Sequence, residues 1–229
     1  MIILVRHGEA THHTLKLTGG WTDSELTARG EQQLAAAGAK LALDFTGKDS
    51  DKLRLRILAS DLKRAARSAQ IIAKKLAAAG FNAPVEYHSF LREKNNGAAA
   101  GMTEEAAKRI YRKPASEQEL NHRNYPGGET RNEFYLRNIT GLKKCADWEN
   151  EHLLIVAHKG TVQNLIFAWL GMSMEDVVTH GFSVDIAPAS ITVLGVNKWH
   201  EHALFRLNDT SHLAGGAGFG IFDFKYERR

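Results

Sequence analysis

The chain of 229 residues contains one cysteine, Cys145, and no long hydrophobic run. A single cysteine excludes a disulfide within the chain. No apolar stretch approaches the ~20 residues that a membrane-spanning helix needs. The apolar run after Met1 is four residues long, too short for a secretory signal. We therefore expect a cytoplasmic protein that does not associate with membranes.

Charge of one sign is not concentrated in any segment either. The formal net charge is +4 and the pI is about 9.1, but lysines and arginines are scattered along the chain. The sequence has no zinc-finger spacing and no basic run with interleaved aromatics, so we expect no nucleic-acid partner. Mild basicity is compatible with a small anionic substrate. The oligomeric state stays open.

Short apolar runs alternate with helical patterns along most of the chain. The runs typical of buried strands are 2–5, 54–59, 153–157, 190–196 and 203–207, with a weaker one at 84–87. Helical periodicity covers 62–76, 130–142 and 162–169. We predict a single α/β domain over 1–229, with a three-layer αβα architecture around a doubly wound, mostly parallel sheet.

Two stretches do not follow this alternation of strands and helices. Residues 91–129 hold several turn signals and one short helical pattern near 103–112, and we expect them to form a small insertion over the active site. The tail from Leu213, with its AGGAGFG run, is expected to be a surface segment.

The helix expected at 130–142 carries a start signal and an apolar face. Thr130 and Glu133 have the spacing of a capping box. Its buried face is expected to consist of Phe134, Leu136, Ile139 and Leu142.

Three of the predicted strands lead directly into polar side chains. These are Arg6, His7 and Gly8 after the first, Ser60, Asp61 and Arg64 after the second, and His158, Lys159 and Gly160 after the third. Doubly wound sheets bind ligands beyond the carboxyl ends of their strands. The helix start expected after His158 adds unpaired backbone N–H groups and a positive dipole end. Two arginines and two histidines at this edge predict a phosphate site.

The same residue types are suited to moving a phosphoryl group. A neutral imidazole is a nucleophile near pH 7 and can hold a phosphoryl group covalently. Arginines stabilise the charge on the transferred group without a metal ion. We expect Gly8 to keep the backbone small where the phosphate approaches.

Several sequence blocks follow one another along residues 2–213. They are LVRHGEA with GGWTDSELTARGEQQ, then ASDLKRAARSAQ, LREKNNG, LIVAHKGTVQNLI and RLNDTSHL. In this order they resemble the blocks of the histidine phosphatase superfamily, which includes the phosphoglycerate mutases. The resemblance spans nearly the whole chain, and ordered blocks are far more specific than the short RHG motif alone.

The resemblance implies a role for each matching residue. His7 would be the nucleophile, and Arg6, Arg64 and His158 would hold the phosphoryl oxygens, with His158 also taking part in catalysis. Glu93 would protonate the leaving oxygen and then activate water. The implied function is metal-independent hydrolysis of a phosphate monoester through phosphohistidine. Its partner would be a small phosphorylated substrate, and no cofactor is expected.

Further candidates for substrate contact are His13, Gly20, Trp21, Glu129 and Lys159. Two of them depart from the family pattern, since Lys159 stands where a glycine is usual and His13 replaces a common asparagine. The segment 98–100 is Ala-Ala-Ala where the family often has Glu-Trp-Glu. These departures concern specificity more than the phosphate pocket.

A metal site and two other functions are alternatives to this interpretation. His12 and His13 with His7 lack the H-E-x-x-H spacing, and there are no cysteine pairs, so no metal is predicted. One alternative is a phosphoglycerate mutase-type transfer, but the adjacent arginine pair of the mutases is missing from the insertion. The other is a non-catalytic phosphate-binding module, which would need neither a nucleophile nor an acid. The sequence does not identify the substrate.

Overall fold

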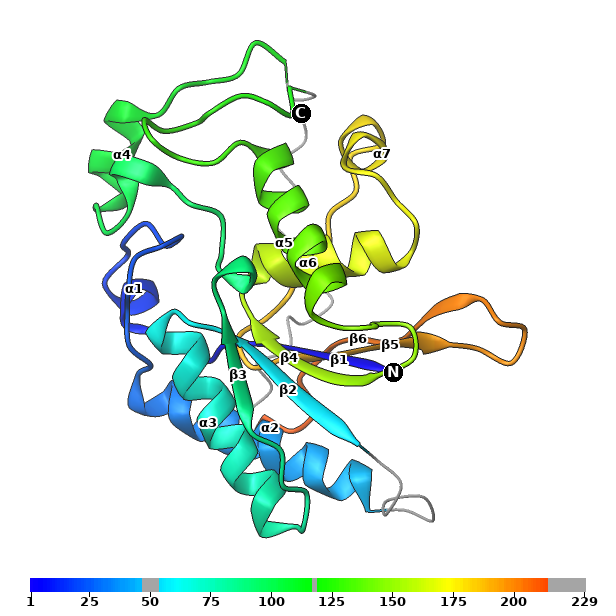
Figure 1. The fold of residues 1–229 in the computed structure, drawn as a ribbon. Helices are drawn as coiled ribbons and strands as arrows, with labels where there is room; N and C mark the ends of the chain where they lie inside the picture. The colour runs from blue at the N-terminus through cyan, green and yellow to red at the C-terminus, as the bar shows by residue number, and fades with distance from the viewer. Residues whose placement is uncertain (47–53, 117–118, 214–229) are drawn as a thin grey trace.

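A computed structural model describes residues 1–46, 54–116 and 119–213, and shows one sheet between two helical layers (Figure 1). The strands are β1 (Ile2–Arg6), β2 (Leu55–Ser60), β3 (Val85–His88), β4 (His152–Ala157), β5 (Ile191–Val196) and β6 (His202–Asp209). Their order across the sheet is β3-β2-β4-β1-β5-β6. Each predicted strand is present, with ends shifted by two residues or fewer.

The sheet is mostly parallel, as predicted. Strands β3, β2, β4 and β1 run in one direction, β5 is antiparallel to β1, and β6 is antiparallel to β5. Because β1 lies beside β4, with Ile2 opposite Leu153, the segments that follow these two strands leave the sheet side by side. This pairing places residues from opposite ends of the sequence at one edge of the sheet.

Helices cover both faces of the sheet, which confirms the three-layer α/β fold. α2 (Ala28–Phe45) and α3 (Lys63–Ala78) lie on one face, and α5 (Arg131–Cys145) and α6 (Lys159–Trp169) lie on the other (Figure 1). The smaller helices are α1 (Thr11–Thr14), η2 (Ser89–Leu91), η3 (Gly97–Ala99), α4 (Glu104–Ile110) and α7 (Met174–Thr179). The sequence analysis did not predict α2 or α7.

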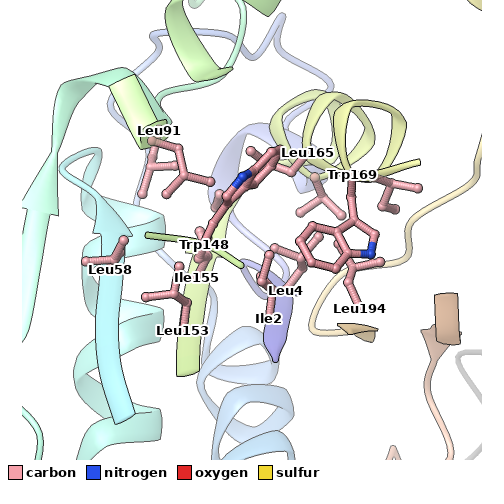
Figure 2. Close-up of a cluster of buried hydrophobic side chains, with 14 of the residues drawn as sticks. Ile2, Leu4, Leu58, Leu91, Trp148, Leu153, Ile155, Leu165, Trp169 and Leu194 are labelled. Atoms are coloured by element: carbon pink, nitrogen blue, oxygen red, sulfur yellow. The ribbon is translucent and has the colours of Figure 1, made fainter. Parts of the chain in front are cut away.

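Alternation along each strand divides the core into two clusters. In β1, Ile2 and Leu4 pack toward α5 and α6, whereas Ile3 and Val5 pack toward α2 and α3. The first cluster surrounds Trp148 and Trp169, whose rings meet edge to face at 5.6 Å (Figure 2). Burial on both faces explains why the strands appear as continuous apolar runs in the sequence.

The start of α5 agrees with the sequence, but its buried face does not. Thr130 and Glu133 form the predicted capping box. Leu136, expected in the core, is 51% exposed, and Asn138 is buried instead. The Asn138 amide donates to Phe90 O at 2.6 Å and accepts from Asn164 at 2.8 Å, so its burial leaves no polar group unpaired. Leu136 points outward because it lies two residues from Phe134, across the helix.

The segment 91–129 extends beyond the carboxyl ends of the parallel strands, next to the segment that holds α1 (Figure 1). Leu17 and Thr103 form an isolated β-bridge, and Thr18 N–H donates to Met102 O at 2.8 Å. The expected role of residues 91–129 as an insertion over the active site stays a prediction. The predicted surface tail from 214 onward lies outside the described residues. No helix in the described part of the chain is long and apolar enough to span a membrane.

Candidate active site

The ends of β1, β2 and β4 bring three of the predicted residues into contact. His7 follows β1, Arg64 lies in the first turn of α3 after β2, and His158 follows β4. Arg64 Nε donates to His7 Nε2 at 3.3 Å, and the rings of His7 and His158 are 5.1 Å apart. All three side chains are 3% exposed or less. The convergence expected from the strand ends is therefore present.

His7 is held as a neutral imidazole with one defined tautomer. Its Nδ1 lies 2.7 Å from the carbonyl oxygen of Gly8, and a carbonyl only accepts, so Nδ1 carries the proton. Nε2 then keeps its lone pair and accepts from Arg64. Burial, followed by the charges of Arg64, His158 and Arg6, lowers the pKa of His7 well below 6.5. The ring is thus prepared as a nucleophile rather than as a cation.

The Arg64 guanidinium is fixed by backbone carbonyls and not by a carboxylate. Nη2 donates to Gly20 O at 2.7 Å and Nη1 donates to Thr22 O at 2.6 Å. Burial lowers the pKa of Arg64 to about 10, which still leaves it charged at neutral pH. Gly20, a predicted substrate contact, therefore serves in this structure to orient Arg64. Its φ of 73° is one that glycine adopts without strain.

Arg6 and His13 present donors toward each other. Arg6 Nη1 donates to Ile186 O at 2.5 Å, and Nη2 lies 3.2 Å from His13 Nε2. His13 Nδ1 accepts from Ala10 N–H at 3.2 Å, and burial lowers the pKa of His13 to about 4, so Nε2 carries the hydrogen of a neutral ring. Two N–H groups that face each other need a shared acceptor, and an anion would provide one.

Two buried nitrogen atoms of Arg6 and His158 also lack a hydrogen-bond partner among the described residues. These are Arg6 Nε and His158 Nδ1. His158 Nε2 lies 2.9 Å from Ser60 Oγ, and a proton from this hydroxyl would leave Nδ1 as the free donor. Buried polar groups without a partner cost about 1–3 kcal/mol each, and a bound phosphate would satisfy them. Burial and the nearby arginines also lower the pKa of His158 well below 6.5.

Glu93 is anchored at the start of α6. Its carboxylate accepts from Gly160 N–H at 3.0 Å and from Lys94 N–H at 2.9 Å. Its backbone carbonyl accepts from Trp21 Nε1 at 2.8 Å and from Arg137 Nη2 at 3.0 Å. Trp21, a predicted substrate contact, thus supports the segment that carries Glu93.

Glu129, another predicted substrate contact, supports the same segment. Its carboxylate pairs with Arg137, with Nε at 2.7 Å and Nη2 at 2.8 Å, and accepts from Asn95 N–H at 2.8 Å. Arg137 Nη1 donates to Phe90 O at 2.9 Å. Arg137 was not predicted from the sequence, because a single cation within a helical pattern does not reveal which backbone carbonyls will surround it in the fold.

The remaining predicted contacts have different surroundings. Lys159 begins α6 and pairs with Asp185 at 2.5 Å, with almost half of its side chain exposed. At Gly8, a Cβ would lie 2.6 Å from Gly30 O and 2.3 Å from Leu34 Cδ2. Close packing against α2 therefore requires a glycine here, and the approach of a phosphate to Gly8 stays a prediction.

His12 and His13, the histidines next to each other that could suggest a metal site, contact other protein groups. His12 is buried, and its Nδ1 lies 2.7 Å from Ser24 Oγ. Within residues 1–46, 54–116 and 119–213, the one set of three potential metal ligands with donor atoms close together is Glu86, His88 and Cys145. Arg56 already pairs with the carboxylate of Glu86 in that set, so a cation there would compete with a guanidinium.

The chain is similar in sequence to known proteins. The sequence profile of the histidine phosphatase superfamily (branch 1) matches residues 2–210. The broad-specificity phosphatase YOR283W of Saccharomyces cerevisiae is 28% identical, over 94% of this chain and 88% of that protein. The protein named probable phosphoglycerate mutase GpmB of Erwinia tasmaniensis is 32% identical, over 75% of each chain.

Solved structures share the fold. The α-ribazole phosphatase of Shigella flexneri superposes with a TM-score of 0.69 at 23% identity, over 91% of this chain and 96% of that chain. A mycobacterial glucosyl-3-phosphoglycerate phosphatase superposes with a TM-score of 0.67 at 22% identity, over 90% and 98% of the two chains. The profile match over nearly the full length carries the assignment: the chain belongs to branch 1 of the histidine phosphatase superfamily.

Proposed function

We propose that the protein is a phosphatase that hydrolyses a phosphate monoester through a phosphohistidine at His7, without a metal ion. The observation that carries the proposal is the neutral His7 ring, whose Nε2 accepts from Arg64 and whose neighbours Arg6 and His158 hold buried nitrogen atoms without a partner among the described residues. Membership of the histidine phosphatase superfamily and relatives named as phosphatases support it.

The first half-reaction transfers the phosphoryl group to the enzyme. Arg6, Arg64 and the N–H of His158 bind the phosphoryl oxygens, and the contact between Arg64 Nε and His7 Nε2 opens to admit the phosphorus. The Nε2 lone pair forms the P–N bond as the P–O bond to the leaving group breaks. The leaving oxygen takes a proton from the Glu93 carboxyl, which must be protonated for this step.

The second half-reaction returns the enzyme to its starting state. Glu93, now a carboxylate, accepts a proton from water as the water oxygen attacks phosphorus. The P–N bond breaks, its electron pair returns to His7 Nε2, and inorganic phosphate leaves. The arginines stabilise the charge on the transferred group in both halves, the role that a metal ion has in other phosphatases.

A labelling experiment tests the nucleophile. The protein is mixed with a ³²P-labelled aryl phosphate and quenched in denaturant at high pH, where a phosphohistidine survives. We expect label on His7 that is lost in acid, together with release of inorganic phosphate. His7→Ala is expected to abolish both, while His180→Ala, a change at an exposed histidine, leaves both intact. Turnover by His7→Ala would contradict the proposal, and phosphate binding without any turnover would favour a binding module.

Mutase activity is the second candidate, because one relative is named as a probable phosphoglycerate mutase. The arginines of the insertion do not favour it: Arg123 pairs with Glu133 and donates to Gly128 O at 2.5 Å, and Arg109 and Arg112 are exposed. Incubation with 3-phosphoglycerate and a trace of 2,3-bisphosphoglycerate separates the two. We expect inorganic phosphate from monoesters and little 2-phosphoglycerate; rapid formation of 2-phosphoglycerate with little phosphate release would reverse the choice.

A further inference from the structure

A pocket of about 360 Å³ adjoins Glu93 and Gly160 at the start of α6. A second hollow of about 410 Å³ shares Lys94, Arg131 and Phe182 with it. We refer to the two together as the α5–α7 pocket, after the helices that contribute Arg131 and Val177. Because Glu93 lines this pocket, a leaving group that Glu93 protonates has the pocket directly beside it.

The part of the α5–α7 pocket nearest Glu93 is lined by buried apolar side chains. Phe134, Phe167, Met174 and Val177 line it, and each is 8% exposed or less. Phe167, Met174 and Val177 also pack against one another as a small core cluster. A small, fully hydroxylated leaving group would make poor use of such a surface, whereas a ring or an aliphatic body would bury apolar area against it.

Two cations lie in both parts of the pocket. Lys94 Nζ donates to Asn124 Oδ1 at 3.1 Å, and in the part of the chain that the structure describes neither Lys94 nor Arg131 has a carboxylate within 4.0 Å. Burial lowers the pKa of Lys94, and the charge of Arg131 lowers it further, so the two cations disfavour each other; the charges of Glu129 and Glu93 offset only part of this. A bound anion would relieve this repulsion.

The position of Arg131 in its helix adds to the argument. Arg131 is the first residue of α5, where the helix dipole disfavours a cation. Helix stability therefore does not account for an arginine there. Of the carboxylates that line the pocket, Glu93 is bonded to two backbone N–H groups, and Glu119 accepts from Ala115 N–H and lies 3.9 Å from His122. Neither of them forms an ion pair with Lys94 or Arg131.

We propose that the α5–α7 pocket takes the leaving group of the substrate, and that this group has an apolar body with a second anion held by Lys94 and Arg131. The substrate class is thus a phosphate monoester that also carries a carboxylate or a further phosphate. This inference rests on the proposed function for its link to catalysis, but the pocket can be tested by binding alone.

The binding test uses phosphonates, which are not hydrolysed. We compare 3-carboxybenzylphosphonate, 3-phosphonobenzylphosphonate and the similarly shaped 3-carbamoylbenzylphosphonate, whose ring substituent is uncharged, by calorimetry on the full chain. We expect at least one anionic probe to bind about 10-fold or more tightly than the carbamoyl probe, as for a charge-assisted contact in a partly buried site. The better of the two probes identifies the anion as a carboxylate or a phosphate.

Variants assign the preference to the two cations. Arg131→Met and Lys94→Met are each expected to reduce it to about 3-fold or less while the carbamoyl probe binds as before. Arg109→Met removes an exposed cation of α4 outside the pocket and is expected to leave the preference unchanged. Equal binding of all three probes to the unmodified protein, or a preference that survives both pocket variants, would overturn the inference.

Hydrolysis of the corresponding phenyl phosphates separates this inference from the proposed function. The same preference in kcat/KM would support both. A binding preference without hydrolysis of any ester would retain the pocket and contradict the proposed phosphatase. Hydrolysis with no preference for the anionic esters would retain the phosphatase and contradict the pocket.

Discussion

The carboxylate of Glu93 accepts a hydrogen bond from the backbone N–H of Gly160 at 3.0 Å, which ties the loop after β3 to the start of α6. A Cβ at position 160 would lie 2.5 Å from Glu93 Oε1 and 3.0 Å from the ring of Phe134. The absence of a side chain at Gly160 therefore determines how close the proposed acid can come to the phosphate site.

Gly160→Ala is expected to displace Glu93 and lower kcat by about 10-fold or more, because a small misplacement of a catalytic group is costly. Helix propensity favours alanine over glycine by about 1 kcal/mol, which offsets part of the steric cost in stability. Steady-state kinetics and urea unfolding measure the two effects. In a Glu93→Gln background the same change is expected to have little further effect on kcat, and additive losses would show that Gly160 acts elsewhere.

Arg137→Met is expected to lower both stability and kcat. The change leaves the Glu129 carboxylate, whose side chain is 16% exposed, without its cation. It also removes one hydrogen bond from each of the carbonyls of Phe90 and Glu93, which keep those from Asn138 and Trp21. Breaking a largely buried pair in this way costs about 3 kcal/mol or more in unfolding free energy. Urea unfolding and kinetics measure the losses.

The double variant Arg137→Met with Glu129→Gln tests whether Arg137 positions Glu93. We expect it to recover part of the stability, because the uncompensated charge is removed, but not kcat, because Glu93 O still lacks the hydrogen bond from Arg137. The pH dependence of kcat/KM is also expected to change in Arg137→Met. A kcat that recovers together with stability would assign Arg137 a purely structural role.

Acid is expected to destabilise the protein through its buried histidines. The pKa values of His7 and His158 are well below 6.5 in the folded chain, so the folded state binds fewer protons than the unfolded state below that pH. Their contribution to the free energy of unfolding is complete above about pH 6.5. It is lost as the pH falls toward the pKa values that the two histidines have in the folded chain. Below about pH 6, each of these histidines lowers the free energy of unfolding by about 1.4 kcal/mol for every pH unit of acidification.

Urea unfolding between pH 7 and pH 4.5 measures this dependence. His158→Asn is expected to reduce the slope by about 1.4 kcal/mol per pH unit, because one of the neutral histidines with a lowered pKa is gone. His180→Asn, at an exposed position, is expected to keep the original slope. Equal slopes for the original protein and His158→Asn would contradict the assignment of His158 as a buried neutral ring.

Activity is expected to survive removal of metal ions. Arg6, Arg64 and the free N–H of His158 supply the positive field that a divalent cation provides in other phosphatases. Prolonged dialysis against EDTA followed by an assay in metal-free buffer checks this. Loss of activity that one added metal ion restores would show that the reaction depends on that ion.

The amino-acid sequence was sufficient to predict the strands and the edge where they place polar residues. The strands are short apolar runs because both faces of the sheet are covered, and His7, Arg64 and His158 are joined directly to strand ends or to the first turn of a helix. Residues attached in this way have little freedom once the sheet forms. Their convergence therefore follows from local sequence and strand order.

The pattern of α2 shows where local signals fail. Alanines and the glycines at positions 30 and 38 weaken its hydrophobic periodicity, but they allow close contact with other segments. A Cβ at Gly30 would lie 2.0 Å from Glu9 O, and one at Gly38 would lie 2.9 Å from the Lys75 side chain of α3. Such close packing is a property of two surfaces and is not visible in either one alone.

The directions of loop side chains were decided only by the tertiary structure. Gly20, Trp21 and Glu129 are predicted substrate contacts, and in the fold they also hold Arg64 and the segment of Glu93 in place. Their partners are backbone carbonyls and an arginine far away in the chain, which no spacing encodes. The sequence determined which groups reach the site, and long-range packing determined which of them face the site and which support the others.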